Sequence, residues 1–132
     1  MAKAKEMPVI IDTSVWVDYF HGKDKELIEV VKDLIIVRRA RLCGVILCEL
    51  MAGVRTEADQ NLLAEVIEVV DYLEVSRPIW ELAGKTSARL RSHGIKVPIS
   101  DLVIGALAIE HNCQLLTADS HFDYIPELKR FP

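Results

Sequence analysis

Short apolar segments alternate with longer segments of helical periodicity along almost the whole chain. The short segments, which we interpret as strands, lie within residues 8–12, 41–43, 72–75, 114–117 and 128–131, and we expect the first of them to be buried. Between them, apolar residues recur at helical spacing within residues 13–21, 24–39, 45–54, 57–70, 78–92 and 101–111. Because alternating strands and helices favour a parallel sheet covered on both faces, we expect an α/β fold. The prediction is a three-layer α/β/α sandwich with a short, mainly parallel central sheet.

The chain length and composition predict one domain. The chain has 132 residues, of which 51% are hydrophobic, enough for a core and part of a partner surface. Residues 1–7 are short and mixed in charge, so we expect a flexible N-terminal tail followed by a single domain over residues 8–132.

Two features predict a cytoplasmic protein without a membrane segment. We expect no signal peptide, because residues 1–7 are short and mixed in charge, and no apolar run approaches the length that spans a bilayer. The three cysteines, Cys43, Cys48 and Cys113, are an odd number without a CxxC pair, which disfavours a disulfide framework or a zinc site. We expect them to be free, buried and kept in a reducing compartment.

Two aspartates follow predicted strands. Asp12 comes after Val-Ile-Ile, and Asp119 comes shortly after Leu115-Leu116-Thr117. Side chains at the carboxyl ends of parallel strands border the crevice where ligands bind. The alternatives are purely structural, because Asp12 could cap the next helix and Asp119 could form an Asp-Ser turn.

Two further acids lie in apolar helical segments. Glu49 is the only charge in its neighbourhood, so we expect a partly buried carboxylate that needs a cation or a basic partner. Asp101 opens the run Leu102-Val-Ile-Gly-Ala-Leu-Ala-Ile. The alternatives are that Glu49 points to water and that Asp101 is an acid favoured at a helix start.

Taken together, the four acids can converge in one crevice. Clustered carboxylates repel one another unless a divalent cation lies between them, and oxygen ligands favour Mg²⁺ or Mn²⁺ over zinc. Such an ion activates water and offsets phosphate charge. A protein that binds nucleic acid through its charge alone is normally basic, whereas this chain has a net charge of −4. A bound cation would supply the positive charge that attracts phosphate.

The order of these segments resembles a known family. The segments are Val-Ile-Ile-Asp12-Thr-Ser, Cys-Glu49-Leu, Val-Pro-Ile-Ser-Asp101 and Leu-Leu-Thr-Ala-Asp119-Ser-His-Phe. Together they resemble a PIN domain and, more narrowly, the VapC toxins of bacterial and archaeal toxin–antitoxin pairs. The likeness extends over nearly the whole chain from residue 8.

The resemblance implies a Mg²⁺- or Mn²⁺-dependent endoribonuclease that cleaves RNA, inhibits translation and is neutralised by a cognate VapB-like antitoxin. It also implies a homodimer and a higher-order toxin–antitoxin complex. The matching catalytic and metal-binding positions are Asp12, Glu49, Asp101 and Asp119. Supporting positions are Thr13, Ser14, Thr117 and Asp123. The segment before Glu49 departs from the pattern, because it lacks the usual Ser or Thr.

Several other residues have both a functional and an ordinary interpretation. Candidate phosphate contacts, which could equally be solvated surface, are Arg55, Arg89, Arg91 and Lys96. The wide apolar face of residues 27–37 is either core or a groove for an antitoxin helix. We interpret the four histidines as surface or capping residues, with His121 the nearest to the predicted site.

Two alternative functions stay open from the sequence. One is a PIN-like nuclease of RNA processing rather than a toxin. The other is a non-catalytic module that binds a divalent metal or phosphate, such as a receiver domain. A receiver would place paired acids after its first strand, where this chain has Asp12 alone.

Overall fold

Five short strands form one parallel sheet in the order β3-β2-β1-β4-β5 in the computed structural model, which describes residues 6–132. The strands are β1 (Val9–Ile11), β2 (Ala40–Cys43), β3 (Asp71–Leu73), β4 (Gln114–Leu116) and β5 (Lys129–Arg130). Every pairing between neighbours is parallel. The prediction of a short parallel sheet is confirmed.

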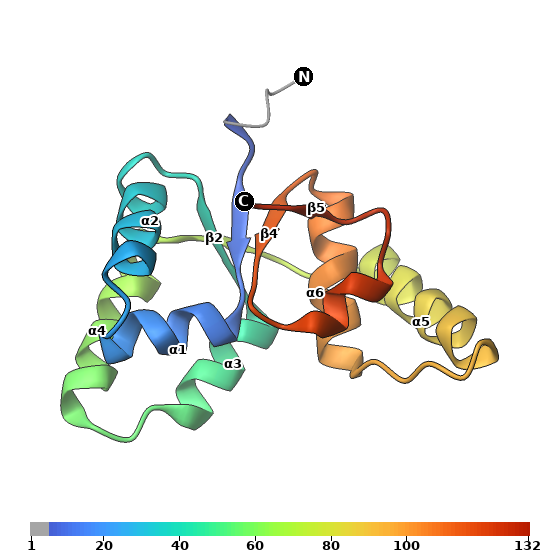
Figure 1. The fold of residues 1–132 in the computed structure, drawn as a ribbon, viewed down its shortest axis with the longest axis horizontal. Helices are drawn as coiled ribbons and strands as arrows, with labels where there is room; N and C mark the ends of the chain where they lie inside the picture. The colour runs from blue at the N-terminus through green and yellow to red at the C-terminus, as the bar shows by residue number, and fades with distance from the viewer. Residues whose placement is uncertain (1–5) are drawn as a thin grey trace.

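Six α-helices cover this sheet. They are α1 (Thr13–His21), α2 (Lys25–Ile36), α3 (Gly44–Gly53), α4 (Glu57–Val69), α5 (Arg77–Ser92) and α6 (Ile99–Glu110), with a 3-10 helix, η2 (Ser120–Tyr124), after β4. Helices α1 to α4 lie on one side of the central strands, and α5 and α6 lie on the other (Figure 1). The three-layer α/β/α prediction is therefore confirmed. Among residues 6–132, no helix combines the length and apolarity needed to cross a membrane.

Local sequence signals explain where several helices begin and end. The side chain of Asp24 accepts a hydrogen bond from Leu27 N and starts α2, and Thr56 starts α4 in the same way through Asp59 N. Helix α1 ends at Gly22, whose φ of 70° is the left-handed conformation that glycine tolerates best. Helix α6 is buried over residues 101–108, as its continuous apolar run predicts.

The strand order places the carboxyl ends of β1 and β4 side by side. The chain moves outward from β1 to β2 and β3, then returns to the other side of β1 for β4 and β5. In parallel sheets, ligands bind beyond the carboxyl ends of the strands at such a reversal. The register pairs Ile11 with Leu116, so Asp12 and Thr117 both lie directly past this edge.

Close packing brings the segment after β4 against α6. A Cβ atom added to Gly105 in the middle of α6 would lie 2.7 Å from Cδ1 of Ile125, which follows η2. The missing side chain thus allows η2 to sit near the helix that presents Asp101. This contact helps to explain why Asp119 and Asp101, far apart in sequence, become neighbours.

Two expectations from the sequence need correction. Met7 is buried and its carbonyl accepts a hydrogen bond from Arg39 Nε at 2.8 Å, so the predicted tail does not extend to Met7. Residues 1–5 of that tail lie outside the described residues. Cys43 and Cys113 are buried as expected, but Cys48 on α3 is exposed.

Candidate active site

Asp12 lies at the carboxyl end of β1 and is buried, with 5% of its surface exposed. It stands at the N-cap position of α1, but its side chain accepts no capping hydrogen bond. Instead Oδ2 accepts hydrogen bonds from Thr117 Oγ1 at 2.8 Å and Ser14 Oγ at 3.2 Å. The simple capping interpretation is therefore wrong. Among the described residues no donor reaches the other oxygen, Oδ1, so it remains available for a ligand.

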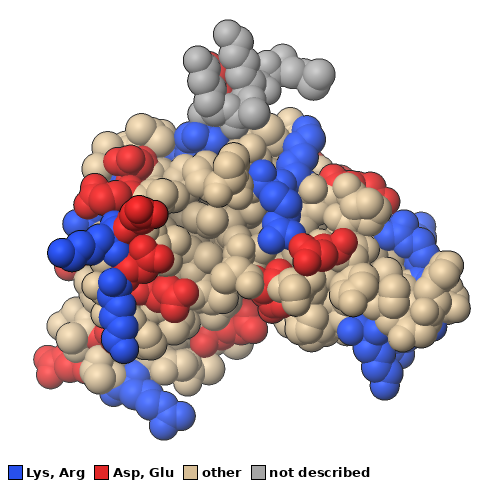
Figure 2. All heavy atoms as spheres, viewed as in Figure 1, with Lys and Arg blue, Asp and Glu red and all other residues tan. Residues whose placement is uncertain are grey.

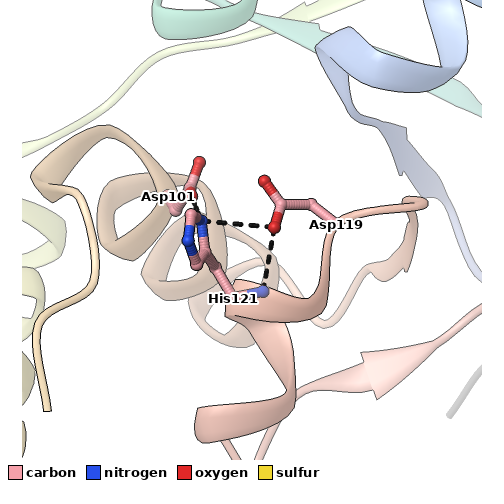
Figure 3. A group of neighbouring side chains, drawn as sticks. All are labelled: Asp101, Asp119 and His121. Atoms are coloured by element: carbon pink, nitrogen blue, oxygen red, sulfur yellow. Dashed lines mark hydrogen bonds and ion pairs between the residues drawn. The ribbon is translucent and has the colours of Figure 1, made fainter.

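Asp101, Asp119 and His121 form a compact cluster from α6 and the segment around η2 (Figure 3). His121 Nδ1 lies 2.8 Å from Asp101 Oδ2 and 3.2 Å from Asp119 Oδ1. Asp119 Oδ1 also accepts the backbone N–H of His121 at 2.9 Å. Asp119 therefore forms the expected turn through Oδ1. The imidazole of His121 lies between this carboxylate and that of Asp101.

Thr117 connects this cluster to Asp12. Its hydroxyl donates to Asp12 Oδ2 and accepts the backbone N–H of Asp119 at 3.0 Å. A single side chain therefore fixes the carboxylate after β1 and the backbone that presents the carboxylate after β4. Thr117 and Ser14, which we expected to support the acids, both donate hydrogen bonds to Asp12 Oδ2.

Glu49 reaches the same region from α3, but the expectation that it is partly buried is wrong. Its side chain is exposed, and Oε1 accepts a hydrogen bond from Thr13 Oγ1 at 2.8 Å. Helix α3 buries Ile46 and Leu50 on its other side, so its apolar composition does not enclose Glu49. Thr13 thus joins Glu49 to the segment that begins with Asp12.

The electrostatics show that these carboxylates affect one another. Burial is the main cause that raises the pKa of Asp101, and the charges of Asp119 and Asp12 raise it further, while the hydrogen bond from His121 opposes this rise. The hydrogen bond to Asp101 is in turn the main cause that raises the pKa of His121. On the other side, burial raises the pKa of the Cys43 thiol, with smaller contributions from Glu49 and Asp12. Asp12 is therefore within electrostatic reach of both halves of the site.

This donor set fits a divalent cation. Ligand atoms of Asp101, Asp119 and His121 all lie within 4.8 Å of one another. Asp12 adds a third carboxylate whose charge acts on Asp101. Oxygen donors in this number suit Mg²⁺ or Mn²⁺, and a cation would relieve the mutual repulsion of the acids.

Comparison with known proteins agrees with this geometry. A family model described as PIN domain matches residues 9–128. The chain belongs to the PIN-domain family.

Named relatives and solved structures extend the comparison. The chain is similar to ribonuclease VapC11 of Mycobacterium tuberculosis, with 29% identity over 124 residues that cover 91% of this chain and 92% of VapC11. Ribonuclease VapC19 of the same species is 27% identical over 121 residues, covering 91% and 96%. The structure of VapBC2 from Rickettsia felis, bound to a promoter DNA fragment, has a TM-score of 0.82 at 21% identity and covers 95% of this chain and 98% of that one. This last likeness shows the fold.

The basic residues of this PIN domain are distributed unevenly around the acids. Figure 2 shows acidic side chains gathering in a notch between the two halves of the molecule, with Lys and Arg at its margins. Arg91 and Lys96 line a depression together with His121. Arg89 pairs with Glu127 at 3.4 Å instead, and Arg55 is exposed in the loop between α3 and α4. Of the four candidates, Arg91 and Lys96 are the two that line the depression beside His121.

The structure places His121 in the acidic cluster and Asp123 outside it, which differs from the prediction made from the sequence. Asp123 is exposed and pairs with Arg130 Nη1 at 2.9 Å, so the structure does not bring it to the four acids. His121, interpreted from the sequence as a surface residue, contacts two of them. The available signal was its spacing of two residues from Asp119, which lets a short turn fold the ring back over the carboxylate.

Proposed function

We propose that this PIN domain is a divalent-cation-dependent endoribonuclease and acts as the toxin of a toxin–antitoxin pair. The main support is the convergence of Asp12, Asp101 and Asp119 at the strand-order reversal, with Glu49 joined to them through Thr13. The ribonuclease names of the VapC relatives add support. RNA phosphodiester bonds are the proposed substrate.

The side chains of the site divide into two roles. Asp12, Asp101, Asp119 and Glu49 would hold one or two Mg²⁺ or Mn²⁺ ions, which when bound promote attack by water and offset charge on phosphate. Thr117 and Ser14 hold Asp12 through the same oxygen, and Thr13 orients Glu49. These hydroxyls fix the carboxylates before substrate arrives, which lowers the cost of organising the site.

In this proposal Arg91 and Lys96 bind the RNA backbone. Both side chains are exposed beside His121, at the edge of the acidic cluster. A phosphate placed between them and the acids would meet positive charge on one side and the cation site on the other. This arrangement explains how a chain of net charge −4 can bind RNA.

The proposed antitoxin site is the outer end of α2. The helix buries Val31 and Leu34, whereas Ile36 and Val37 are 75% and 60% exposed. Adjacent apolar side chains of this kind suit the apolar face of a partner helix. The solved VapBC complexes that share this fold support a VapB-like partner in a larger assembly.

We further propose that the protein forms a homodimer and acts in the cytoplasm. An apolar depression lined by the half-exposed rings of Tyr72 and Trp80 has the character of an interface with another copy. The three free cysteines are consistent with a reducing cytoplasm.

A cleavage assay tests the proposed function. Purified protein is incubated with total RNA in the presence of EDTA, and then with excess Mg²⁺ or Mn²⁺. We expect discrete cuts that EDTA abolishes and the metals restore, and sequencing of the new ends would identify the target. Tight metal binding without any cleavage would instead favour the non-catalytic metal-binding module.

A further inference from the structure

His121 occupies a position in the acidic cluster that its two hydrogen bonds do not fully explain. Its Nδ1 contacts both Asp101 Oδ2 and Asp119 Oδ1, although a neutral imidazole has only one proton to donate, on one of its two nitrogens. The ring side chain is 43% exposed, so burial does not force this double contact. Figure 3 shows the ring lying against both carboxylates.

The distances in this cluster match those between neighbouring ligands of a metal ion. Around an octahedral cation with ligands at about 2.0–2.2 Å, adjacent ligand atoms are roughly 3 Å apart. The separations of 2.8 Å and 3.2 Å from Nδ1 to the two carboxylate oxygens are of this size. The three residues thus offer two oxygens and one nitrogen without a large rearrangement.

We infer that Nδ1 of His121 is a ligand of the divalent cation together with Asp101 and Asp119, and that this nitrogen makes the site select Mn²⁺ over Mg²⁺. The inference rests on the proposed function, because it concerns the cation of the same site. Mg²⁺ binds imidazole poorly and prefers oxygen, whereas transition-metal ions accept a nitrogen ligand more readily.

A different role for His121 gives the opposite expectation. If the ring were a resident positive charge that fills the place of the cation, it would compete with the metal and have to move aside. Replacing it would then tighten metal binding. If the ring is a ligand, replacing it weakens binding of Mn²⁺ and has little effect on Mg²⁺.

Pulsed electron paramagnetic resonance of bound Mn²⁺ tests the inference directly, because it detects nitrogen nuclei coordinated to the ion. The samples are wild type, His121→Gln and, as a matched control, His111→Gln at the exposed end of α6. At about pH 8, above the ordinary pKa of imidazole, we expect nitrogen coupling in wild type and His111→Gln and none in His121→Gln. Labelling histidine with ¹⁵N should change the coupling pattern in wild type.

Calorimetric titration with each metal completes the test. We expect His121→Gln to bind Mn²⁺ at least about tenfold more weakly while its affinity for Mg²⁺ changes less than about threefold. Mn²⁺ bound by wild type without nitrogen coupling, or tighter Mn²⁺ binding by His121→Gln, would overturn the inference and leave the cation site intact. Failure of wild type to bind either metal would overturn both this inference and the cation dependence proposed above.

Discussion

Replacing Thr117 by valine tests whether one hydroxyl organises the acids. Valine has nearly the same shape but loses the hydrogen bond to Asp12 Oδ2 at 2.8 Å and the one from Asp119 N at 3.0 Å. A hydrogen bond to a charged group contributes about 1.5–3 kcal/mol and a neutral one about 0.5–1.5 kcal/mol. The expected loss of folding free energy is therefore about 2–4 kcal/mol, or roughly a 10 °C fall in Tm for a domain of this size.

The rate of RNA cleavage by Thr117→Val should fall together with its folding stability. Asp12 would keep only its hydrogen bond from Ser14, so its carboxylate would no longer be held in one orientation. Loss of a residue that orients a metal ligand typically costs about 10- to 100-fold in activity or metal affinity. Differential scanning calorimetry and an RNA cleavage assay measure the two effects, with Thr117→Ser as the control that keeps the hydroxyl. A Thr117→Val protein with unchanged Tm and unchanged cleavage would refute this reasoning.

Three further predictions address charge, substrate and partner. Burial raises the folded-state pKa of Asp101 above its unfolded value, so the ionised carboxylate destabilises the folded protein as pH rises through these values. Asp101→Asn should therefore stabilise the metal-free protein by about 0.5–2 kcal/mol near pH 7 and have no effect near pH 3. Denaturant unfolding at the two pH values measures this difference. Arg91→Ala should raise the KM for RNA several-fold and reduce the salt dependence of binding by about one charge, whereas an unaltered salt slope would exclude a phosphate contact. Ile36→Glu should weaken antitoxin binding by at least about tenfold without slowing cleavage, and intact binding in a pull-down with the cognate antitoxin would rule out this face.

The alternation of strands and helices was enough to predict most of the fold. Strand β1 is an apolar run, and helices such as α2 and α5 have a periodic apolar face, so local pattern and tertiary structure agree there. Strand β5 consists of two exposed charged residues, Lys129 and Arg130, and depends on its pairing with β4. The order of the strands in the sheet is not a local property, because it depends on which side of β1 the chain returns to. That order is what makes the ends of β1 and β4 neighbours.

The four acids could be predicted from their positions in the sequence, but their environments could not. Glu49 lies in an apolar run, yet it is exposed, because helix α3 buries only one of its sides. Asp123 is close to Asp119 in sequence, but the 3-10 turn directs it to Arg130. His121 gains its role from a contact with Asp101, 20 residues away, which no local pattern reports.

The most direct test of the central claim is the rate of RNA cleavage by Asp12→Asn with saturating Mn²⁺. Asparagine can still accept hydrogen bonds from Thr117 and Ser14, so we expect an unchanged fold by circular dichroism. Its neutral amide is a poorer ligand than a carboxylate, and we expect cleavage to fall by at least about 100-fold. Asp33→Asn, an exposed substitution on α2, should cut RNA at the wild-type rate. Wild-type cleavage by Asp12→Asn would contradict an active site built on these carboxylates.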